Sequence, residues 1–587
     1  MASLYKNLIA KKLARTILSN YQHGGLQEIE AAIQSLVKVA PVRKEKIRDS
    51  QFTVSLSQLT KCLRGHIVNL DQIQTDGNLD VKIDHDLIHF KTEPAKLAQA
   101  VLQDVKVNHI NYGYMGRTNG SQKHVCVEFS SPNVAKPFHV GHLRSTIIGN
   151  VISNFYEAAG HRVKRINWIG DWGTQFGLVS LGLMRFGDVE LLKQDPLLEL
   201  FNVYVKINQA VAAECGTNSE SMSPTYQEGM ALFSKLEKGD EHMMTIWRMI
   251  RDLSLQELNK MYQRLGVHFT HILSESEYHN RTQEILERLS QKDLLLYDSD
   301  GVGYVETEIK GVGRATVVKS DGSSLYLTRD IASALDRQEK FSFDHVHYVV
   351  EQGQKAHFIK LVSILQKLGV PWANSSIDDI HVRFGRVNGM STREGNVVFL
   401  RDVLDEARTR VRDTMLKKTS TRASQDDMEK TADVIGVASI ILQDLKANRV
   451  ADYTFSWERM LNLKADSGVF VQYCHARLNS MMTNCGVQPS DDIDISCIVK
   501  DDALMNIVLH LARYPEVFEY SLDSLEPHHV VQYLFKLCHF INAAYTSCPV
   551  KGEPQDLAQA RLFTFECAKQ VLQNCLLLLG LKPLDVI

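Results

Sequence analysis

The chain has 587 residues, of which 44% are hydrophobic, 23% charged and 8% aromatic, an ordinary composition for a soluble globular protein. At roughly 150 residues per domain, this length predicts about three or four domains. No apolar run reaches the roughly 20 residues of a bilayer-spanning helix, so the sequence excludes an integral membrane protein. The 66 lysines and arginines nearly balance the 69 aspartates and glutamates, so any surface that binds nucleic acid must be a local patch.

The N-terminal segment is basic. Lys6, Lys11, Lys12 and Arg15 occur before the first acidic residue of the chain. This composition is typical of a mitochondrial transit peptide, and it is equally typical of a basic first helix of the folded protein. From composition alone, both interpretations of residues 1–20 stay open.

The ten cysteines are too few for a disulfide scaffold, and none forms a C-x-x-C pair. Seven of them lie beyond residue 470, within apolar helical patterns. We therefore expect buried thiols in a reducing compartment and no structural zinc.

Composition also marks two boundaries. Residues 111–122 are rich in glycine and predict a linker, and residues 419–428 form a second polar stretch. Between them, short β-rich runs alternate with helical patterns, which predicts βαβ units on a parallel sheet. The strands that we expect are His124–Phe129, Val163–Ile169, Ser324–Leu327, His345–Val350 and His381–Phe384. After residue 428 the apolar periodicity is helical almost throughout, which predicts a helical bundle.

The most informative stretch is 125–149, VCVEFSSPNVAKPFHVGHLRSTIIG. It predicts a strand, a loop broken by prolines and a helix over 143–159. His139, Gly141 and His142 then fall at a strand-to-helix turn, where backbone N–H groups and the helix dipole favour an anion. Gly141 lacks the side chain that would keep a ligand away. Taken alone, His-x-Gly-His is also typical of two histidines that cap an ordinary helix.

This turn resembles the HIGH signature of class I aminoacyl-tRNA synthetases, here His139-Val140-Gly141-His142. The flanking segments VEFSSPN and LRSTIIGN are similar to those of arginyl-tRNA synthetases in particular. The resemblance implies a Rossmann-type catalytic domain in which the turn binds ATP, accompanied by Mg²⁺. His139 and His142 would be catalytic, and His139, Gly141 and His142 would bind the nucleotide.

The expected fold is therefore α/β. We expect a Rossmann-type parallel-sheet catalytic domain over residues 116–420 and a small N-terminal tRNA-contacting domain over 21–115. A C-terminal all-helical bundle over 429–587 would bind the anticodon, and 1–20 is the candidate transit peptide.

The second signature of the class, KMSKS, is degenerate in this chain. The corresponding segment is 389–396, GMSTREGN, in which Gly389 and Thr392 replace both lysines. Departure of pyrophosphate still builds negative charge that a cation should stabilise, and Arg386 and Arg393 are available. The resemblance implies a catalytic role for Arg393 and contacts with ATP for Met390 and Ser391.

Lys136 bears on whether the enzyme is active. Many arginine enzymes that lack the signature lysines carry a lysine just before HIGH, and Lys136 matches it. The alternative for Lys136 is a solvated loop lysine. The alternative for the whole chain is a catalytically silent protein that binds tRNA.

Recognition of arginine requires carboxylates and a flat or hydroxyl-bearing partner for its guanidinium. Tyr326 and Asp330 lie four residues apart, where we expect a strand to end and a helix to begin. They resemble the family's tyrosine and aspartate that contact the arginine side chain. Without the resemblance they would be a core tyrosine and a helix N-cap. Glu275 resembles the acid of the family's Gly-Glu-Ser turn, here Ser-Glu-Ser.

Other family matches surround the backbone end of the amino acid. The resemblance implies that arginine also contacts Ser131, Pro132, Asn133, His142 and Gln354. Glu128 either orients this site or is a partly exposed strand carboxylate. The signature GDWGTQFG at 170–177 also matches the family, without a role that sequence alone assigns.

The C-terminal third resembles the family's anticodon-binding domain in the segments DSGVFVQY at 466–473 and YPEV at 514–517. Basic residues elsewhere either contact tRNA phosphates or form solvated faces, namely Arg408, Arg410, Arg412, Arg43, Lys44, Lys46 and Arg48. Together these features imply an arginine–tRNA ligase that binds ATP, L-arginine and tRNA(Arg) as a monomer, without a membrane. The segment around HIGH is most similar to the organellar branch of the family. We therefore expect the mitochondrial matrix, with the cytoplasm as the alternative.

Overall fold

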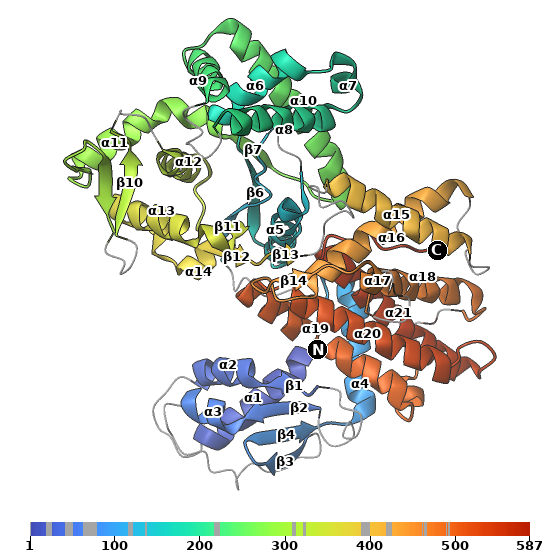
Figure 1. Ribbon diagram of the computed structural model, residues 1–587. Helices are drawn as coiled ribbons and strands as arrows, with labels where there is room; N and C mark the ends of the chain where they lie inside the picture. Colours follow the sequence, from blue (N-terminus) through green and yellow to red (C-terminus); the bar gives the residue numbers. More distant parts are fainter. Residues whose placement is uncertain are drawn as a thin grey trace. The chain divides into compact units, whose positions relative to one another are not determined.

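The computed structural model describes residues 2–18, 26–41, 51–62, 79–114, 121–134, 138–215, 223–307, 313–320, 325–388, 399–417, 425–460, 462, 466–488, 490 and 493–587. The chain forms two compact units, whose elements are labelled in Figure 1. The first unit consists of Met1–Arg117, Met415–Thr431 and Arg459–Ile587, and the second of Thr118–Thr414 and Ala432–Glu458.

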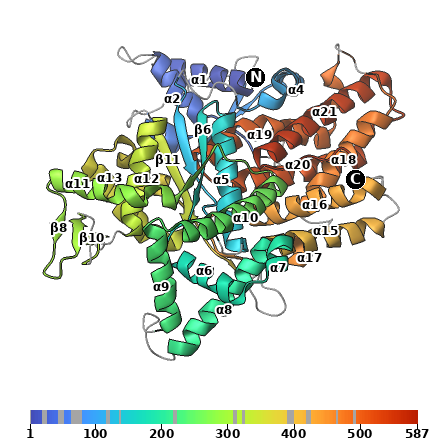
Figure 2. The ribbon, with the colours of Figure 1, turned by 90° about the horizontal axis from the view of Figure 1, so that it is seen from above.

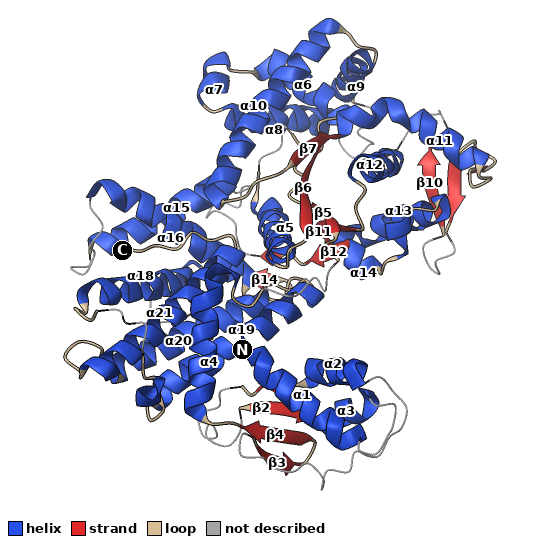
Figure 3. Ribbon diagram, turned by 180° about the vertical axis from the view of Figure 1, so that it is seen from behind, coloured by secondary structure: helices blue, strands red, loops and turns tan. Residues whose placement is uncertain are grey.

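The first unit contains an N-terminal α/β part and a C-terminal helical part. Its elements are α1 (Ala2–Leu18), α2 (Leu26–Leu36), β1 (Lys38–Val39), β2 (Phe52–Ser55), α3 (Leu56–Cys62), β3 (Asp80–Asp84), β4 (Leu87–Lys91), α4 (Pro94–Asn108), η2 (His109–Asn111), α18 (Gly468–Asn484), η7 (Ile495–Ile498), α19 (Asp502–Ser524), α20 (His528–Ser547) and α21 (Gln555–Leu578). Figure 3 shows helices as the main content of the C-terminal part. Six of the seven cysteines beyond residue 470 are buried, and all seven are free thiols.

The second unit is built on a parallel sheet. Its elements are β5 (His124–Glu128), α5 (Val140–Ala158), β6 (Arg162–Ile169), α6 (Thr174–Phe186), α7 (Val189–Gln194), α8 (Pro196–Cys215), α9 (Pro224–Glu237), α10 (Glu241–Leu265), β7 (His271–Ser274), η4 (Glu275–Arg281), α11 (Thr282–Gln291), β8 (Leu296–Tyr297), β9 (Gly303–Glu306), β10 (Arg314–Val318), α12 (Tyr326–Phe341), β11 (His345–Glu351), η5 (Gln352–Gln354), α13 (Lys355–Leu368), η6 (Pro371–Asn374), α14 (Ile377–Ile380), β12 (His381–Phe384), β13 (Val387–Asn388) and β14 (Tyr453–Thr454). Three further helices contain residues of both units, namely α15 (Leu400–Leu416), α16 (Gln425–Leu445) and α17 (Trp457–Met460).

The central sheet has the strand order β12-β11-β5-β6-β7, and every neighbouring pair is parallel. In chain order this is the 3-2-1-4-5 arrangement of a doubly wound fold, read from β7 to β12. Figure 2 shows the strands β6 and β11 between α5 on one side and α12 on the other. The order reverses between β5 and β11, and such a switch point is where doubly wound proteins bind ligands. The predicted α/β, Rossmann-type fold is confirmed.

Four of the five predicted strands are confirmed, and one is wrong. In the predicted strand 324–327, the described residues 325–327 are not a strand, because α12 begins at Tyr326 and Leu325 is its N-cap. Leu327 and Ile331 are both buried one helical turn apart, so the apolar residues that suggested a strand belong to a helical stripe. As a result, Tyr326 and Asp330 lie one turn apart on the same helix.

The N-terminal part is an antiparallel sheet of order β1-β2-β4-β3 with packed helices. Residues 2–18 form α1, which buries Ile9 and Leu13 completely. The ring of Tyr5 stacks on that of Phe52 in β2, with centroids 6.0 Å apart. In this structure, the basic segment is therefore a helix of the folded protein.

Two tyrosines near the start of the predicted linker 111–122, Tyr112 and Tyr114, are buried. Tyr112 is buried and its hydroxyl donates to the carbonyl oxygen of Leu511, at 3.0 Å. Pro515 in α19 has no N–H for that carbonyl, so Tyr112 replaces the missing helical hydrogen bond. A Cβ on Gly113 would lie 2.8 Å from the Tyr514 ring, which explains the glycine. Residues 111–114 thus pack against the C-terminal bundle.

Helices α6 to α10 lie between β6 and β7 in the chain. Helices α6 and α9 pack closely, because a Cβ on Gly177 would lie 2.0 Å from the carbonyl oxygen of Gly229. Gly177 of the 170–177 signature therefore has a packing role. Within the described part of the chain, no helix is long and apolar enough to cross a membrane.

Candidate active site

A cavity of about 400 Å³ lies at the carboxyl ends of β5 and β11, at the switch point of the sheet. It is bounded by the N-terminus of α5 and by the segments that follow β5, β11 and β12. Five predicted site residues line it: Ser131, His139, Gly141, His142 and Gln354.

Helix α5 begins with a reciprocal cap made by two histidines. Nδ1 of His139 accepts from the N–H of Gly141 at 3.0 Å, and Nδ1 of His142 accepts from the N–H of His139 at 3.3 Å. The two rings stack with centroids 4.0 Å apart. A ring nitrogen that accepts a hydrogen bond carries no proton, so each neutral imidazole carries its proton on Nε2. The cap therefore makes both rings Nε2–H donors beside a helix N-terminus.

Gly141 is required by this cap. A Cβ at Gly141 would lie 2.7 Å from Cε1 and 2.9 Å from Nδ1 of His139. Any side chain would therefore displace the His139 ring from the N–H groups that it caps. The sequence suggested that Gly141 makes room for a ligand, and the structure adds this internal reason.

The turn after β5 is strained. Ser130 and Ser131 have φ angles of 71° and 44°, in the left-handed region that side chains rarely adopt. The N–H of Ser130 donates to Oγ of Ser145 at 2.9 Å, and the N–H of Ser131 donates to Oδ1 of Asn167 at 3.2 Å. Tyr262 bonds both to Oγ of Ser130, at 2.8 Å, and to Asn167. These contacts hold the strained turn in place where Ser130 and Ser131 line the cavity.

Glu128 ends the strand before this turn and is buried. It forms an ion pair with Arg337, and its Oε1 accepts from Oγ of Ser131 at 3.4 Å. The Arg337 guanidinium in turn lies 4.8 Å from the ring centroid of Trp168. Burial raises the pKa of Glu128, and Arg337 opposes that rise. Of the two interpretations from sequence, a partly exposed strand carboxylate is wrong.

Tyr326, Glu275 and Asp330 each contact a charged or ionisable residue of the chain itself. Nε of Arg329 donates to Oε1 of Glu275 at 2.7 Å, and the Arg329 guanidinium lies 4.8 Å from the Tyr326 ring centroid. Oδ2 of Asp330 pairs with Nε2 of His357 at 2.7 Å. Burial raises the pKa of Glu275 to about 7, although Arg329 lowers it.

Asp171 fixes the turn that carries Glu275. This carboxylate is completely buried and accepts from the N–H of Ser276 at 2.9 Å and from its hydroxyl at 2.8 Å. Nε of Arg251 donates to the same carboxylate at 3.1 Å. Asp171 belongs to the signature GDWGTQFG, so part of that signature positions the Glu275 turn.

Gly170 of the same signature makes room for Asn133. A Cβ at Gly170 would lie 2.1 Å from Oδ1 of Asn133. The backbones also pair, because the N–H of Val134 donates to the carbonyl oxygen of Gly170 at 3.0 Å. The predicted residues Pro132 and Asn133 thus run beside the segment that holds Asp171.

Comparison with known proteins agrees with this geometry. The model of the family "tRNA synthetases class I (R), catalytic domain" matches residues 101–457, and that of the "DALR anticodon binding domain" matches 471–587. The chain belongs to the arginyl-tRNA synthetase family. The predicted activity, an arginine–tRNA ligase that uses ATP, is confirmed with it.

Individual relatives of the synthetase cover most of its length. "Probable arginine–tRNA ligase, mitochondrial" of Bos taurus is 39% identical over 94% of this chain and 96% of its own. "Arginine–tRNA ligase, mitochondrial" of Saccharomyces cerevisiae is 39% identical over 85% and 77%. These relatives confirm the prediction of a mitochondrial enzyme. The solved structure of Thermus thermophilus arginyl-tRNA synthetase shares the fold, with a TM-score of 0.79 at 19% identity over 99% of this chain and 100% of that one.

The structure brings most predicted site residues of the synthetase into two groups. Ser131, His139, Gly141, His142 and Gln354 line the cavity, whereas Tyr326 and Glu275 contact Arg329, and Asp330, one turn after Tyr326 on α12, pairs with His357. Four other predicted residues lie outside the described residues, namely Lys136, Met390, Ser391 and Arg393. Arg386, the second cation considered from sequence, lines the cavity and pairs with Glu351 at 2.6 Å.

Sequence reasoning missed the residues that act through others. Asp171, Arg329 and His357 each bond a residue of the predicted arginine pocket or of its turn. Ser145, which supports the strained turn, lies within the quoted segment LRSTIIGN without a role assigned to it. The signal for Asp171 was its place in a family signature, and nothing local in the sequence indicates the other pairs.

Proposed function

We propose that the synthetase binds the triphosphate of ATP at the His139–His142 turn and the arginine side chain between Tyr326, Glu275 and Asp330. The observation that supports this proposal is the reciprocal cap, which leaves an Nε2–H donor on each of two histidines that line the switch-point cavity. A helix N-terminus with added donors suits a phosphate group.

The reaction needs no protein nucleophile. A carboxylate oxygen of arginine attacks the α-phosphorus of ATP, the new O–P bond forms, and the bond to pyrophosphate breaks. A ribose hydroxyl of the terminal adenosine of tRNA(Arg) then attacks the carbonyl carbon, and AMP leaves. The protein contributes position and stabilisation of charge. The histidine donors would stabilise the phosphate oxygens. Lys136 and Arg393 would be further catalytic cations. Met390 and Ser391 would contact ATP.

The charges of the arginine pocket support a cationic ligand. Glu275 and Asp330 supply two carboxylates, whereas Arg329 supplies one permanent cation. One negative charge therefore remains for a guanidinium, and the exposed ring of Tyr326 offers it a flat partner. Ser131, Pro132, Asn133, His142 and Gln354 would contact the backbone end of the amino acid.

Mg²⁺ enters this proposal as a companion of ATP. The ion usually keeps most ligands from water and substrate phosphates and takes one or two carboxylates from the protein. Glu351 is the carboxylate that lines the cavity, so it would be the protein ligand. The ion would neutralise charge on the phosphate oxygens.

Residues 21–115 and 429–587 would contact tRNA(Arg), residues 116–420 would form the catalytic domain, and the enzyme would act as a monomer. Residues 1–20, which contain α1 of the folded protein, would also carry the signal that directs it to the mitochondrial matrix. A fusion of residues 1–30 to a fluorescent reporter tests the last point, and a diffuse cytosolic signal for both the fusion and the full-length protein would contradict it.

Arginine-dependent exchange between ATP and pyrophosphate, with and without tRNA(Arg), tests the activity. We expect exchange with arginine and with no other amino acid. Asp330→Asn should raise the KM for arginine without changing tRNA affinity, because the loss of a charge-assisted pair costs about 2–5 kcal/mol. Lys136→Ala should slow the exchange reaction without changing tRNA affinity. Absence of exchange in both conditions would refute the proposal.

A further inference from the structure

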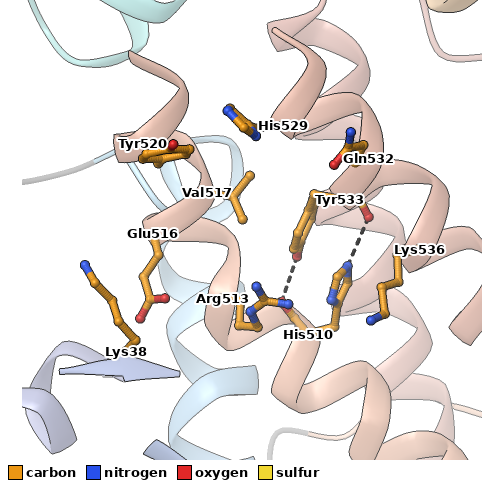
Figure 4. Close-up of a pocket in the computed structure, with 10 residues that line it drawn as sticks. All are labelled: Lys38, His510, Arg513, Glu516, Val517, Tyr520, His529, Gln532, Tyr533 and Lys536. Carbon is orange, nitrogen blue, oxygen red and sulfur yellow. Dashed lines mark hydrogen bonds between the residues drawn. The ribbon is translucent and has the colours of Figure 1, made fainter. Parts of the chain in front are cut away.

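A second hollow lies in the first unit, and none of the predicted ATP- or arginine-binding residues lines it. It has a volume of about 380 Å³ and lies between α19 and α20, with Lys38 of β1 at its edge. Figure 4 shows the side chains that surround it. The N-terminal part and the C-terminal bundle thus both contribute to one site.

The hollow is positively charged. Lys38, Arg513 and Lys536 line it. The one carboxylate in its lining, Glu516, accepts from the N–H of Val39 at 2.8 Å and pairs with the Lys6 ammonium, at 2.5 Å. Since Lys6 neutralises Glu516, that carboxylate does not cancel the three cations.

Arg513 is the unsatisfied cation of the hollow. Among the described residues it makes no hydrogen bond or ion pair, and its buried Nε has no acceptor. A buried guanidinium nitrogen without an acceptor is costly, and an anion in the hollow would remove that cost. The Nε of Arg513 without an acceptor thus indicates an anionic ligand.

The same hollow offers an aromatic surface. Tyr520 is 59% exposed, and its ring centroid lies 4.5 Å from that of His529. At the base of the hollow, His510 and Tyr533 are joined by two hydrogen bonds. Nε2 of His510 donates to the backbone carbonyl oxygen of Tyr533 at 3.0 Å, and the Tyr533 hydroxyl donates to the backbone carbonyl oxygen of His510 at 2.9 Å. Burial lowers the pKa of His510 to about 3, so the base of the hollow is rigid and neutral.

We propose that this hollow binds one unpaired nucleotide of tRNA, its phosphate on the three cations and its base on Tyr520. Cations beside an exposed aromatic ring are the usual means of holding single-stranded nucleic acid. A free mononucleotide would require a pocket that encloses most of its surface, and the exposed ring of Tyr520 favours a base that its own polymer holds in place. The inference rests on the proposed tRNA-charging function.

Equilibrium binding of a tRNA(Arg) transcript to the full-length chain, at several salt concentrations, tests the inference. Tyr520→Ala should raise the Kd roughly 5- to 100-fold, the range for loss of one stacked base, and Tyr520→Phe should restore binding. Arg513→Gln should weaken binding and reduce the slope of log K against log salt by about 1. Lys551→Gln is the matched control, because Lys551 is an exposed lysine of the same unit that does not line the hollow.

Aminoacylation separates this inference from the proposed function. We expect the Tyr520 and Arg513 variants to have a raised KM for tRNA and an unchanged kcat at saturating tRNA. Wild-type charging together with wild-type tRNA affinity in both variants would overturn the inference and leave the function intact. Arg513-dependent binding of AMP or inorganic phosphate, with unchanged tRNA affinity, would overturn it as well, because the ligand would then be a free anion.

Discussion

Asp171→Asn tests whether the Glu275 turn belongs to the arginine pocket. The Asp171 carboxylate accepts two hydrogen bonds from Ser276, at 2.9 and 2.8 Å, and one from Arg251, at 3.1 Å. Asparagine keeps only one acceptor oxygen. In either orientation its NH₂ group would face a donor, either the N–H of Ser276 or Nε of Arg251.

The magnitude follows from these contacts. Hydrogen bonds to a charged group contribute about 1.5–3 kcal/mol each, and a buried donor left unpaired costs about 1–3 kcal/mol. Arg251 is partly exposed, so water replaces part of its contact. We therefore expect the free energy of unfolding to fall by about 2–4 kcal/mol. If the loosened turn misplaces Glu275 and thereby weakens arginine binding by about 1.4 kcal/mol, the KM for arginine rises about tenfold.

Two assays are needed, urea unfolding and arginine-dependent exchange. The KM for ATP should not change, because Asp171 does not line the cavity at the switch point. Asp188→Asn is the matched control, since that carboxylate also accepts two backbone N–H groups, as the N-cap of α7, and asparagine caps equally well. A destabilised Asp171→Asn with a wild-type KM for arginine would show that the turn does not bind the amino acid. Unchanged stability would refute the contacts themselves.

Three further predictions concern other contacts. Gly141→Ala should raise the KM for ATP and slow exchange at least tenfold, because the new methyl group displaces His139; Gly353→Ala, whose Cβ would have 3.7 Å of clearance from Glu351, is the control. The KM for arginine should be about tenfold higher at pH 6 than at pH 8, because Glu275, with its pKa of about 7, must be ionised to bind the guanidinium, and Glu275→Gln should remove this dependence. Tyr112→Phe should lower the free energy of unfolding by about 1–3 kcal/mol in urea, because the Leu511 carbonyl loses its donor, whereas the exposed Tyr297→Phe should not.

The local sequence pattern predicts an element of this fold well where only one type of secondary structure fits the pattern. Short β-rich runs between helical patterns identified β5, β6, β11 and β12, each of which has several buried residues in the structure. The pattern failed at Leu325–Leu327, where the same apolar residues also match the helical period that continues to Ile331. Without the tertiary partners of these residues, the two periods cannot be separated over so short a segment.

Composition locates the boundary between the units but not the packing of its residues. Glycines at 111–122 suggested a linker, and the chain does pass from one unit to the other between Arg117 and Thr118, yet Gly113 is required because Tyr514 occupies the space of a side chain. The partner lies some 400 residues away, and no window of sequence contains both. The same limit applies to the arginine pocket, where Glu275 and Asp330 were predicted but their partners Arg329 and His357 were not.

Such partners change the chemistry assigned to a residue, as the cavity shows for the degenerate second signature. Among the described residues, two arginines line the cavity: Arg144, which is buried and paired with Asp444, and Arg386, which pairs with Glu351 at 2.6 Å. The Arg386 and Glu351 side chains are both substantially exposed, so the pair contributes little to stability and opens at little cost. In the proposed function, the Arg386 guanidinium would turn to a phosphate oxygen of ATP, and the Glu351 carboxylate would then be available to hold the accompanying cation. An exposed pair at this position would therefore supply the positive charge that the two missing signature lysines do not.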